Sequence, residues 1–132
     1  MTSNELTMPS KAVILVDDEK DVVSVFKRYL EISGYEVFSF TDPLLALEHF
    51  KLNKSGYGLI ISDIRMPKMT GLELASRIRE LDRSIPIVLM SAFERASTDI
   101  SPSLNISSFL QKPVSTSTLG VIVGKYVEVT AS

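Results

Sequence analysis

The sequence contains no cysteine and no tryptophan, and only one of its 132 residues is histidine. Without cysteine the chain can form neither a disulfide nor a thiolate metal site, so it requires no oxidising compartment and the cytoplasm is the expected location. Long apolar runs are also missing: the run at residues 85–90 is far shorter than the roughly 20 residues that span a bilayer. We therefore expect no membrane-spanning segment and no membrane partner.

The chain also lacks an excess of either charge, because 14 basic residues stand against 16 acidic ones and the formal net charge is -2. Such a balance offers no basic surface for a nucleic-acid backbone, so direct binding of nucleic acid is not expected. The length and the 45% of hydrophobic residues suit a single domain with its own core. We expect a flexible leader at residues 1–10, the domain at residues 11–129 and a tail at residues 130–132.

Short apolar runs rich in β-branched residues alternate with segments in which apolar residues recur at helical spacing. The runs predict strands at residues 12–16, 35–40, 59–62, 87–90 and 108–111. The other segments predict helices at residues 20–33, 43–50, 72–81, 94–106 and 115–127. Because Pro102 lies inside the fourth helix, that helix is expected to be short or broken. The alternation predicts an α/β fold, a doubly wound three-layer sandwich of five βα units around a parallel sheet.

Polar residues stand where the predicted strands end. Asp17 and Asp18 follow the first strand, Asp63 follows the third, Ser91 the fourth and Lys112 the fifth. Because the carboxyl ends of parallel strands share one edge, and ligands of open α/β sheets bind in the crevice outside that edge, we expect these side chains to converge. Singly, each has an ordinary structural interpretation, such as a helix start, a turn or a solvated lysine. The functional hypothesis depends on their joint placement.

Three carboxylates brought together repel, at roughly 4 kcal/mol per pair at 4 Å for an effective dielectric near 20, so a cation is expected beside them. Oxygen ligands favour a hard cation, Mg²⁺ first and Mn²⁺ as the alternative. A carboxylate held beside Mg²⁺ can act as a nucleophile toward phosphorus, and Asp63 is the candidate acceptor. In that geometry Lys112 would pair with one phosphoryl oxygen while the Ser91 hydroxyl donates to another.

Over residues 11–127 the sequence resembles the receiver domains of two-component response regulators. The family's acidic pair appears as Asp17 and Asp18 within residues 16–19, and its phosphorylation loop appears at residues 63–71. Ser91-Ala92 and Lys112-Pro113 complete the family's set of motifs. The resemblance implies a flavodoxin-like fold whose five-stranded sheet has the order 2-1-3-4-5.

The resemblance also implies the roles of the site residues. Asp63 would be the phosphoacceptor and a metal ligand, Asp18 a direct Mg²⁺ ligand and Asp17 a ligand through water. The backbone carbonyl of Arg65 would be the remaining protein ligand of the metal.

Three further roles follow from the same resemblance. Lys112 falls on the family's phosphate-contacting lysine, and the Lys112-Pro113 bond is typically cis. Ser91 falls where a Thr or Ser moves toward the phosphoryl group, and Phe109 where an aromatic ring changes rotamer. Phe109 departs from the commoner Tyr by lacking its hydroxyl.

The function implied is a signalling switch rather than an enzyme. A sensor histidine kinase or a phosphotransfer protein would donate the phosphoryl group. Phosphorylation would then change the surface formed by the fourth helix, the fifth strand and the fifth helix, and so control a downstream protein or a fused output domain. The chain would be a monomer or a weak dimer.

Two alternatives remain open. A haloacid-dehalogenase-like phosphohydrolase also uses an aspartyl phosphate and Mg²⁺, but its pattern after the first strand is Asp-x-Asp, whereas Asp17 and Asp18 are adjacent here. The chain also has no residues to spare for a cap over a small substrate. The second alternative is a receiver-like interaction module that works without phosphorylation, and the presence of the acids and of Lys112 argues against it.

Overall fold

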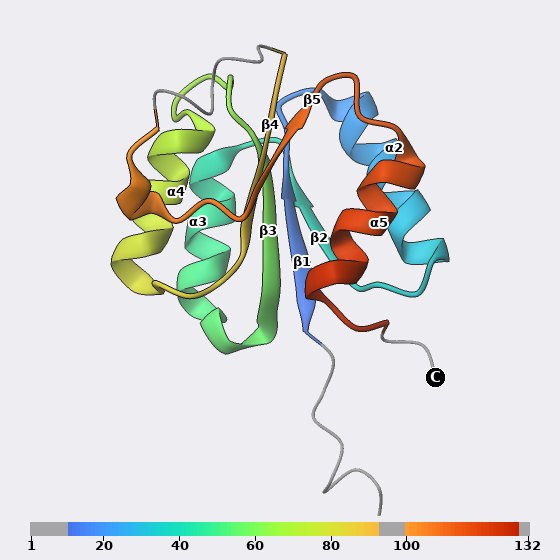
Figure 1. The fold of residues 1–132 in the computed structure, drawn as a ribbon, viewed down its shortest axis with the longest axis horizontal. Helices are drawn as coiled ribbons and strands as arrows, with labels where there is room; N and C mark the ends of the chain where they lie inside the picture. Colours follow the sequence, from blue (N-terminus) through green and yellow to red (C-terminus); the bar gives the residue numbers. More distant parts are fainter. Residues whose placement is uncertain (1–10, 93–99, 130–132) are drawn as a thin grey trace, which may run out of the picture.

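The computed structural model describes residues 11–92 and 100–129, and it shows a parallel sheet between two layers of helices (Figure 1). The strands are β1 (Ala12–Val16), β2 (Val37–Phe40), β3 (Tyr57–Asp63), β4 (Ile87–Ser91) and β5 (Ser108–Gln111). The α-helices in these ranges are α2 (Lys20–Ile32), α3 (Pro43–Leu52), α4 (Gly71–Leu81) and α5 (Thr116–Tyr126), with short 3₁₀ helices η1 (Lys54–Gly56) and η3 (Pro102–Leu104). None of these helices combines the length and the apolar character that crossing a bilayer requires.

The five strands have the order β2-β1-β3-β4-β5, and every neighbouring pair is parallel. The α3 and α4 helices cover one face of the sheet, and α2 and α5 cover the other (Figure 1). The predicted three-layer α/β sandwich and its strand order are therefore confirmed. Because all strands run the same way, the ends of β1, β3, β4 and β5 lie along one rim.

The central strands are apolar throughout because both of their faces are covered. Ile14 and Ile60 pack toward α3 and α4, whereas Leu15 and Ile61 pack toward α2 and α5. Successive residues of a strand point to opposite faces, so β1 and β4 are buried at every position and β3 at all but one. This double burial fixes the register of the strands whose ends carry the polar residues.

The second strand begins later than the sequence pattern suggested, at Val37 rather than at residue 35. Gly34 has a φ of 103°, and the N–H of Tyr35 donates to the carbonyl of Leu30 at 3.0 Å. This arrangement is a Schellman ending, in which the N–H groups of Gly34 and Tyr35 satisfy the last carbonyls of α2. Tyr35 therefore belongs to the helix terminus, whereas the carbonyl of Glu36 already accepts from the N–H of Val13 on β1 at 2.9 Å.

The predicted fourth helix falls partly on residues 93–99, which lie outside the described residues. In its remaining part only the three residues of η3 are helical, and Asn105, which follows them, has a φ of 50°. Pro102 begins η3, the position that a proline tolerates. The side chain of Arg79 on α4 donates to the carbonyls of Leu104 and Asn105 at 2.6 and 2.9 Å, which fixes η3 to α4.

The only histidine lies away from the rim. His49 on α3 packs against Phe38 and Phe40, and its ring shares a hydrogen bond with the hydroxyl of Tyr57. Tyr57 is the first residue of β3 and Asp63 is the last, so His49 is held at the opposite end of that strand from the acidic residues.

Gly71 is required where α4 begins beside the end of β3. Its N–H donates to the carbonyl of Ile64 at 2.8 Å, and a Cβ at this position would lie 2.2 Å from the carbonyl oxygen of Asp63. We expect Gly71→Ala to lower the free energy of unfolding by about 3 kcal/mol, measured by urea denaturation. Gly56→Ala is the control, since a Cβ there meets nothing within 4 Å. Equal, small effects of both substitutions would contradict this close approach.

Candidate functional site

Three carboxylates meet at the rim of the sheet. Asp17 and Asp18 follow β1, Asp63 ends β3, and one oxygen from each lies within 4.8 Å of the others. Asp17 is fully buried and Asp63 is 5% exposed, whereas Asp18 is exposed to solvent. The structure thus brings together the acidic residues that the strand ends indicated.

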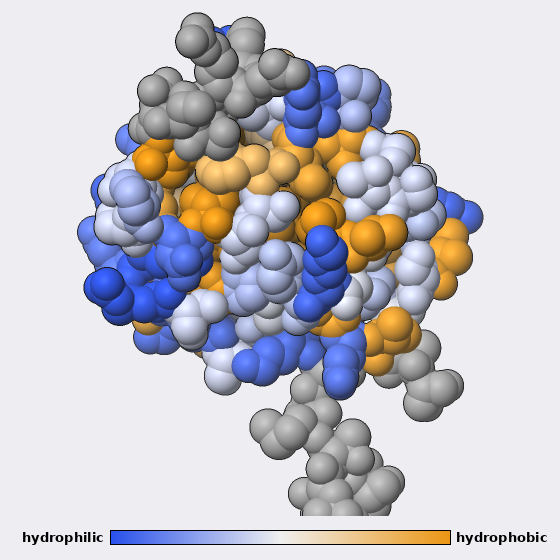
Figure 2. Space-filling model, in the orientation of Figure 1, coloured by the Kyte–Doolittle hydropathy of each residue, from blue (hydrophilic) through white to orange (hydrophobic). Residues whose placement is uncertain are grey.

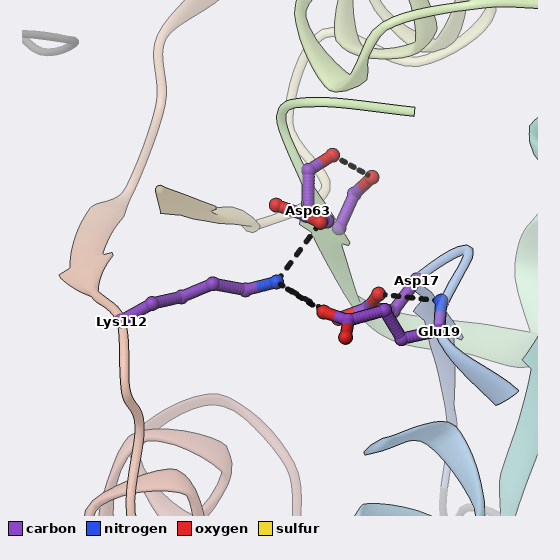
Figure 3. Close-up of polar contacts among 5 residues, drawn as sticks. Asp17, Glu19, Asp63 and Lys112 are labelled. Carbon is purple, nitrogen blue, oxygen red and sulfur yellow. Dashed lines mark hydrogen bonds and ion pairs between the residues drawn. The ribbon is translucent and has the colours of Figure 1, made fainter. Parts of the chain in front are cut away.

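Lys112 reaches into this group from the end of β5. Its Nζ donates to Asp63 Oδ2 at 2.9 Å and to Asp17 Oδ2 at 3.3 Å, and it lies 3.6 Å from Glu19 Oε1 (Figure 3). The N–H of Lys112 also donates to the carbonyl of Ser91 at 2.8 Å, and the Lys112-Pro113 peptide bond is cis. One ammonium therefore compensates part of the charge contributed by β1, β3 and the start of α2.

Burial and charge act in opposite directions on the site residues. Burial raises the pKa of Asp17, although the Glu19 N–H and the Lys112 ammonium both stabilise its charged form. Burial alone would lower the pKa of Lys112, but its hydrogen bond to Asp63 and the neighbouring carboxylates outweigh this, and the net shift is upward. The net effect favours the protonated ammonium of Lys112 and disfavours the charged form of Asp17.

The loop from β3 to α4 is held from several sides. The N–H of Ile64 donates to the carbonyl of Met90 on β4 at 3.0 Å, and Thr70 and Glu73 form a capping box at the start of α4. Lys68 has a φ of 70°, and its ammonium donates to Asp42 at 2.9 Å, which ties the loop to the start of α3. Arg65, whose carbonyl is the expected metal ligand, lies exposed within this braced loop.

Ser91 lies on β4, which is next to β3, and Phe109 lies on β5, one strand further from Asp63. Ser91 is the last residue of β4 and is buried, and it stands opposite Gln111 of β5 in the register. Phe109 is partly buried and lines a cavity of about 230 Å³ together with residues of η3 and its flanks. The two predicted switch residues therefore sit on neighbouring strands, Ser91 at the rim and Phe109 beside η3.

An apolar groove of about 590 Å³ borders the same rim. Its apolar walls come from α2, from the end of β4 and from the connection between β5 and α5: Val22, Val25, Phe26, Met90, Ala92, Pro113 and Val114. Glu19 and Lys112 stand at its edge, so the groove and the acidic group share a boundary.

The sequence pattern alone indicates no separate role for Glu19, Lys68 or Arg79. Glu19 looked like part of an acidic helix start, and only the folded position of Lys112 shows that its carboxylate faces the site. No local pattern indicates the ion pair between Lys68 and Asp42, because 26 residues separate them. The buried position of Arg79 likewise depends on the path of the chain after β4.

The donor set suits a divalent metal ion. Carboxylate oxygens are the ligands that Mg²⁺ prefers, and Asp17, Asp18 and Asp63 supply them at one place. Bound there, a divalent cation would offset the repulsion that Lys112 only partly relieves.

Comparison with known proteins gives a consistent result. Residues 13–123 match the family model of the response regulator receiver domain. The response regulator SaeR of Staphylococcus epidermidis is 30% identical over 104 residues, which cover 78% of this chain and 44% of that protein. The sensor protein EvgS of Escherichia coli is 38% identical over 92 residues, which cover 69% of this chain and 8% of that protein. The chain thus spans less than half the length of these curated relatives.

Solved structures of similar proteins share the fold over most of their length. The response regulator TrrA of Thermotoga maritima, solved in complex with Mg²⁺ and beryllium fluoride, has a TM-score of 0.75 and 30% identity. The match covers 87% of this chain and 97% of that one. The chemotaxis protein CheY4 of Vibrio cholerae has a TM-score of 0.78 and 26% identity, with the same coverage of both chains.

The position of Lys112 leads to a prediction about metal affinity. We expect Lys112→Met to lower the Kd for Mg²⁺ by about tenfold, because the ammonium repels a cation and occupies an oxygen of Asp63. We expect Asp18→Asn to raise the Kd by at least about tenfold, because it removes a charged donor. Isothermal titration calorimetry measures both values.

The control for charge is Lys125→Met, which makes the same change in the last turn of α5, where the helix ends beside the start of β3 and away from the acidic rim. This variant should bind Mg²⁺ as the unmodified protein does. Tightening of equal size in both lysine variants would show that net charge, rather than the contact with Asp63, sets the affinity.

Proposed function

Because the chain belongs to the response regulator receiver domain family, we propose that it is a phosphorylation-dependent switch in which Asp63 accepts a phosphoryl group from a phosphohistidine of a sensor histidine kinase or a phosphotransfer protein. The observation that carries this proposal is the meeting of Asp63 with Asp17, Asp18 and Lys112 at one rim. Receiver domains are regulatory phosphoacceptors, so the only chemistry expected of the chain is its own phosphorylation and slow dephosphorylation.

The residues of the site fit the transfer step. A carboxylate oxygen of Asp63 forms a bond to phosphorus, the bond from phosphorus to the donor imidazole breaks, and its electron pair stays on the imidazole nitrogen. Mg²⁺ held by Asp18, Asp63 and the carbonyl of Arg65, with Asp17 acting through water, would neutralise charge on the transferred group. The complex of TrrA with Mg²⁺ and beryllium fluoride supports this assignment by similarity.

Lys112 and Ser91 complete the proposed step. Lys112 already donates to Asp63 at 2.9 Å, so a short movement of its ammonium reaches an oxygen bonded to phosphorus. The Ser91 hydroxyl, at the end of the adjacent β4, donates to a second phosphoryl oxygen. Both groups act by position and charge, which suffices for phosphoryl transfer because the protein supplies little covalent chemistry beyond the acceptor.

A protein donor must place its phosphohistidine directly over Asp63. The apolar groove borders Glu19 and Lys112, so a protein donor whose phosphohistidine reaches Asp63 lies next to the groove and can cover it. Burial of apolar walls next to a polar transfer site would give affinity without disturbing the charges that carry out the chemistry.

The phosphoacceptor assignment is tested by acetyl phosphate. We expect the protein to gain one phosphoryl group in the presence of Mg²⁺, as seen by intact mass, and Asp63→Asn to gain none. Asp21→Asn, which removes an exposed acid near the start of α2, should behave as the unmodified protein does. Uptake that survives in Asp63→Asn would refute the site.

The same experiment separates the alternatives. No uptake by the unmodified protein would favour an interaction module that works without phosphorylation. Rapid, continuous release of phosphate would favour a phosphohydrolase.

We further propose that phosphorylation changes the surface formed by η3, β5 and α5. Figure 2 shows hydrophobic side chains over this face of the molecule. Leu104, Ile106, Phe109 and Leu110 are only partly buried, and Val121 on α5 is 65% exposed. A rotation of Phe109 against its cavity would alter this surface, so it is suited to report the state of Asp63 to a partner or an output domain.

NMR spectroscopy tests this propagation. On addition of beryllium fluoride and Mg²⁺, we expect amide shifts at the rim and also at Phe109, η3 and the exposed side of α5. The amide of His49, at the opposite end of β3 from Asp63, is the internal control and should shift little. Shifts confined to the acidic residues and Lys112 would contradict a change of this surface.

A further inference from the structure

Glu19 occupies an unusual position for a helix start. It is the N-cap residue of α2, but its side chain makes no capping hydrogen bond, and glutamate is not among the residues favoured there. Its N–H instead donates to Asp17 Oδ1 at 2.9 Å, and its carboxylate lies 3.6 Å from the ammonium of Lys112. Figure 3 shows the side chains of Glu19 and Asp63 approaching this ammonium from different sides. Glu19 therefore faces the phosphorylation site rather than its own helix.

The carboxylate of Glu19 differs from the others in its exposure. Asp17 is fully buried and Asp63 nearly so, whereas the side chain of Glu19 is 64% exposed. Asp17, Asp18 and Asp63 form the group suited to a metal ion, and Glu19 lies outside that group. A bound Mg²⁺ would thus compensate the inner acids first, while Glu19 remains a negative charge on the approach to Lys112.

We propose that Glu19 is a specificity-determining residue that discriminates against small anionic phosphodonors. This inference rests on the proposed function. The Glu19 carboxylate competes with the incoming phosphoryl oxygens for Lys112 and repels the donor by its charge. A protein donor covers the groove that Glu19 borders and can oppose this carboxylate with a cation of its own, whereas a free acyl phosphate cannot. Glu19 thereby favours transfer from a protein partner over transfer from a metabolite.

The test compares rates of phosphoryl uptake from acetyl phosphate at saturating Mg²⁺ and low ionic strength. In this reaction an oxygen of Asp63 bonds to phosphorus and acetate leaves with the electron pair of the broken bond. We expect Glu19→Gln to react about three- to tenfold faster than the unmodified protein, followed by intact mass over time. The ratio should fall toward one in about 1 M salt, where the screening length is roughly 3 Å.

Two variants serve as controls. Glu31→Gln removes the same charge from the last turn of the same helix, where Glu31 pairs with Lys27 at 4.0 Å, and it should react as the unmodified protein does. Glu19→Asp keeps the charge and should remain close to the unmodified rate. Thermal unfolding confirms that each variant is folded at the assay temperature.

A binding measurement separates the role of Glu19 from a merely structural one. Glu19→Gln should bind beryllium fluoride several-fold more tightly in the presence of Mg²⁺, because Lys112 no longer has to leave a second carboxylate. Equal rates and equal affinities for the two proteins at low salt would overturn the inference while leaving the proposed function intact. A rate gain that persists in high salt would also overturn it, since the effect would then not be electrostatic. No uptake by the unmodified protein would instead refute the proposed function.

Discussion

The ammonium of Lys112 holds Asp17, Glu19 and Asp63 at one rim although their carboxylates repel one another. These residues come from the ends of β1 and β3 and from the start of α2, so every element that carries them depends on this compensation. Burying an ion pair contributes little net stability, because the loss of hydration offsets most of the attraction. The arrangement is better understood as a site prepared for added charge. A metal ion bound there would relieve the repulsion among the carboxylates, and the lysine and the metal ion together would offset the negative charge that a phosphoryl group brings.

The loop after Asp63 shows how the backbone keeps this site in place. The first turn of α4 approaches the carbonyl of Asp63 so closely that only a glycine fits at position 71. Lys68 adopts a left-handed conformation that is uncommon for a residue with a side chain, and its ion pair with Asp42 spans the gap to α3. Strained backbone of this kind persists where the surrounding contacts determine it, which is typical of functional loops.

The central part of the fold could be predicted from the sequence because strands buried on both faces appear as continuous apolar runs. The runs at β1, β3 and β4 are apolar at nearly every position, and each ends in a polar residue, so topology alone brings Asp17, Asp63 and Ser91 to one rim. Helix starts were equally readable where a capping side chain such as Asp42 or Thr70 is present. Each of these signals lies within a few neighbouring residues, and the parallel direction of the strands then brings their ends to one rim.

What could not be predicted depends on contacts between distant segments. The ending of α2 at Gly34 delays the start of β2, because the N–H of Tyr35 bonds to the helix instead of to the sheet. The orientation of Glu19 is set by a lysine that is distant in sequence, and the position of η3 by the guanidinium of Arg79. Arg79 fixes the chain just before β5, and Lys112 fixes it just after. The short strand β5 is thus anchored at both ends, whereas the side chain of Phe109 has a cavity beside it. On the proposed mechanism, a change in the partners of Lys112 therefore moves the side chain of Phe109 more easily than it shifts the strand.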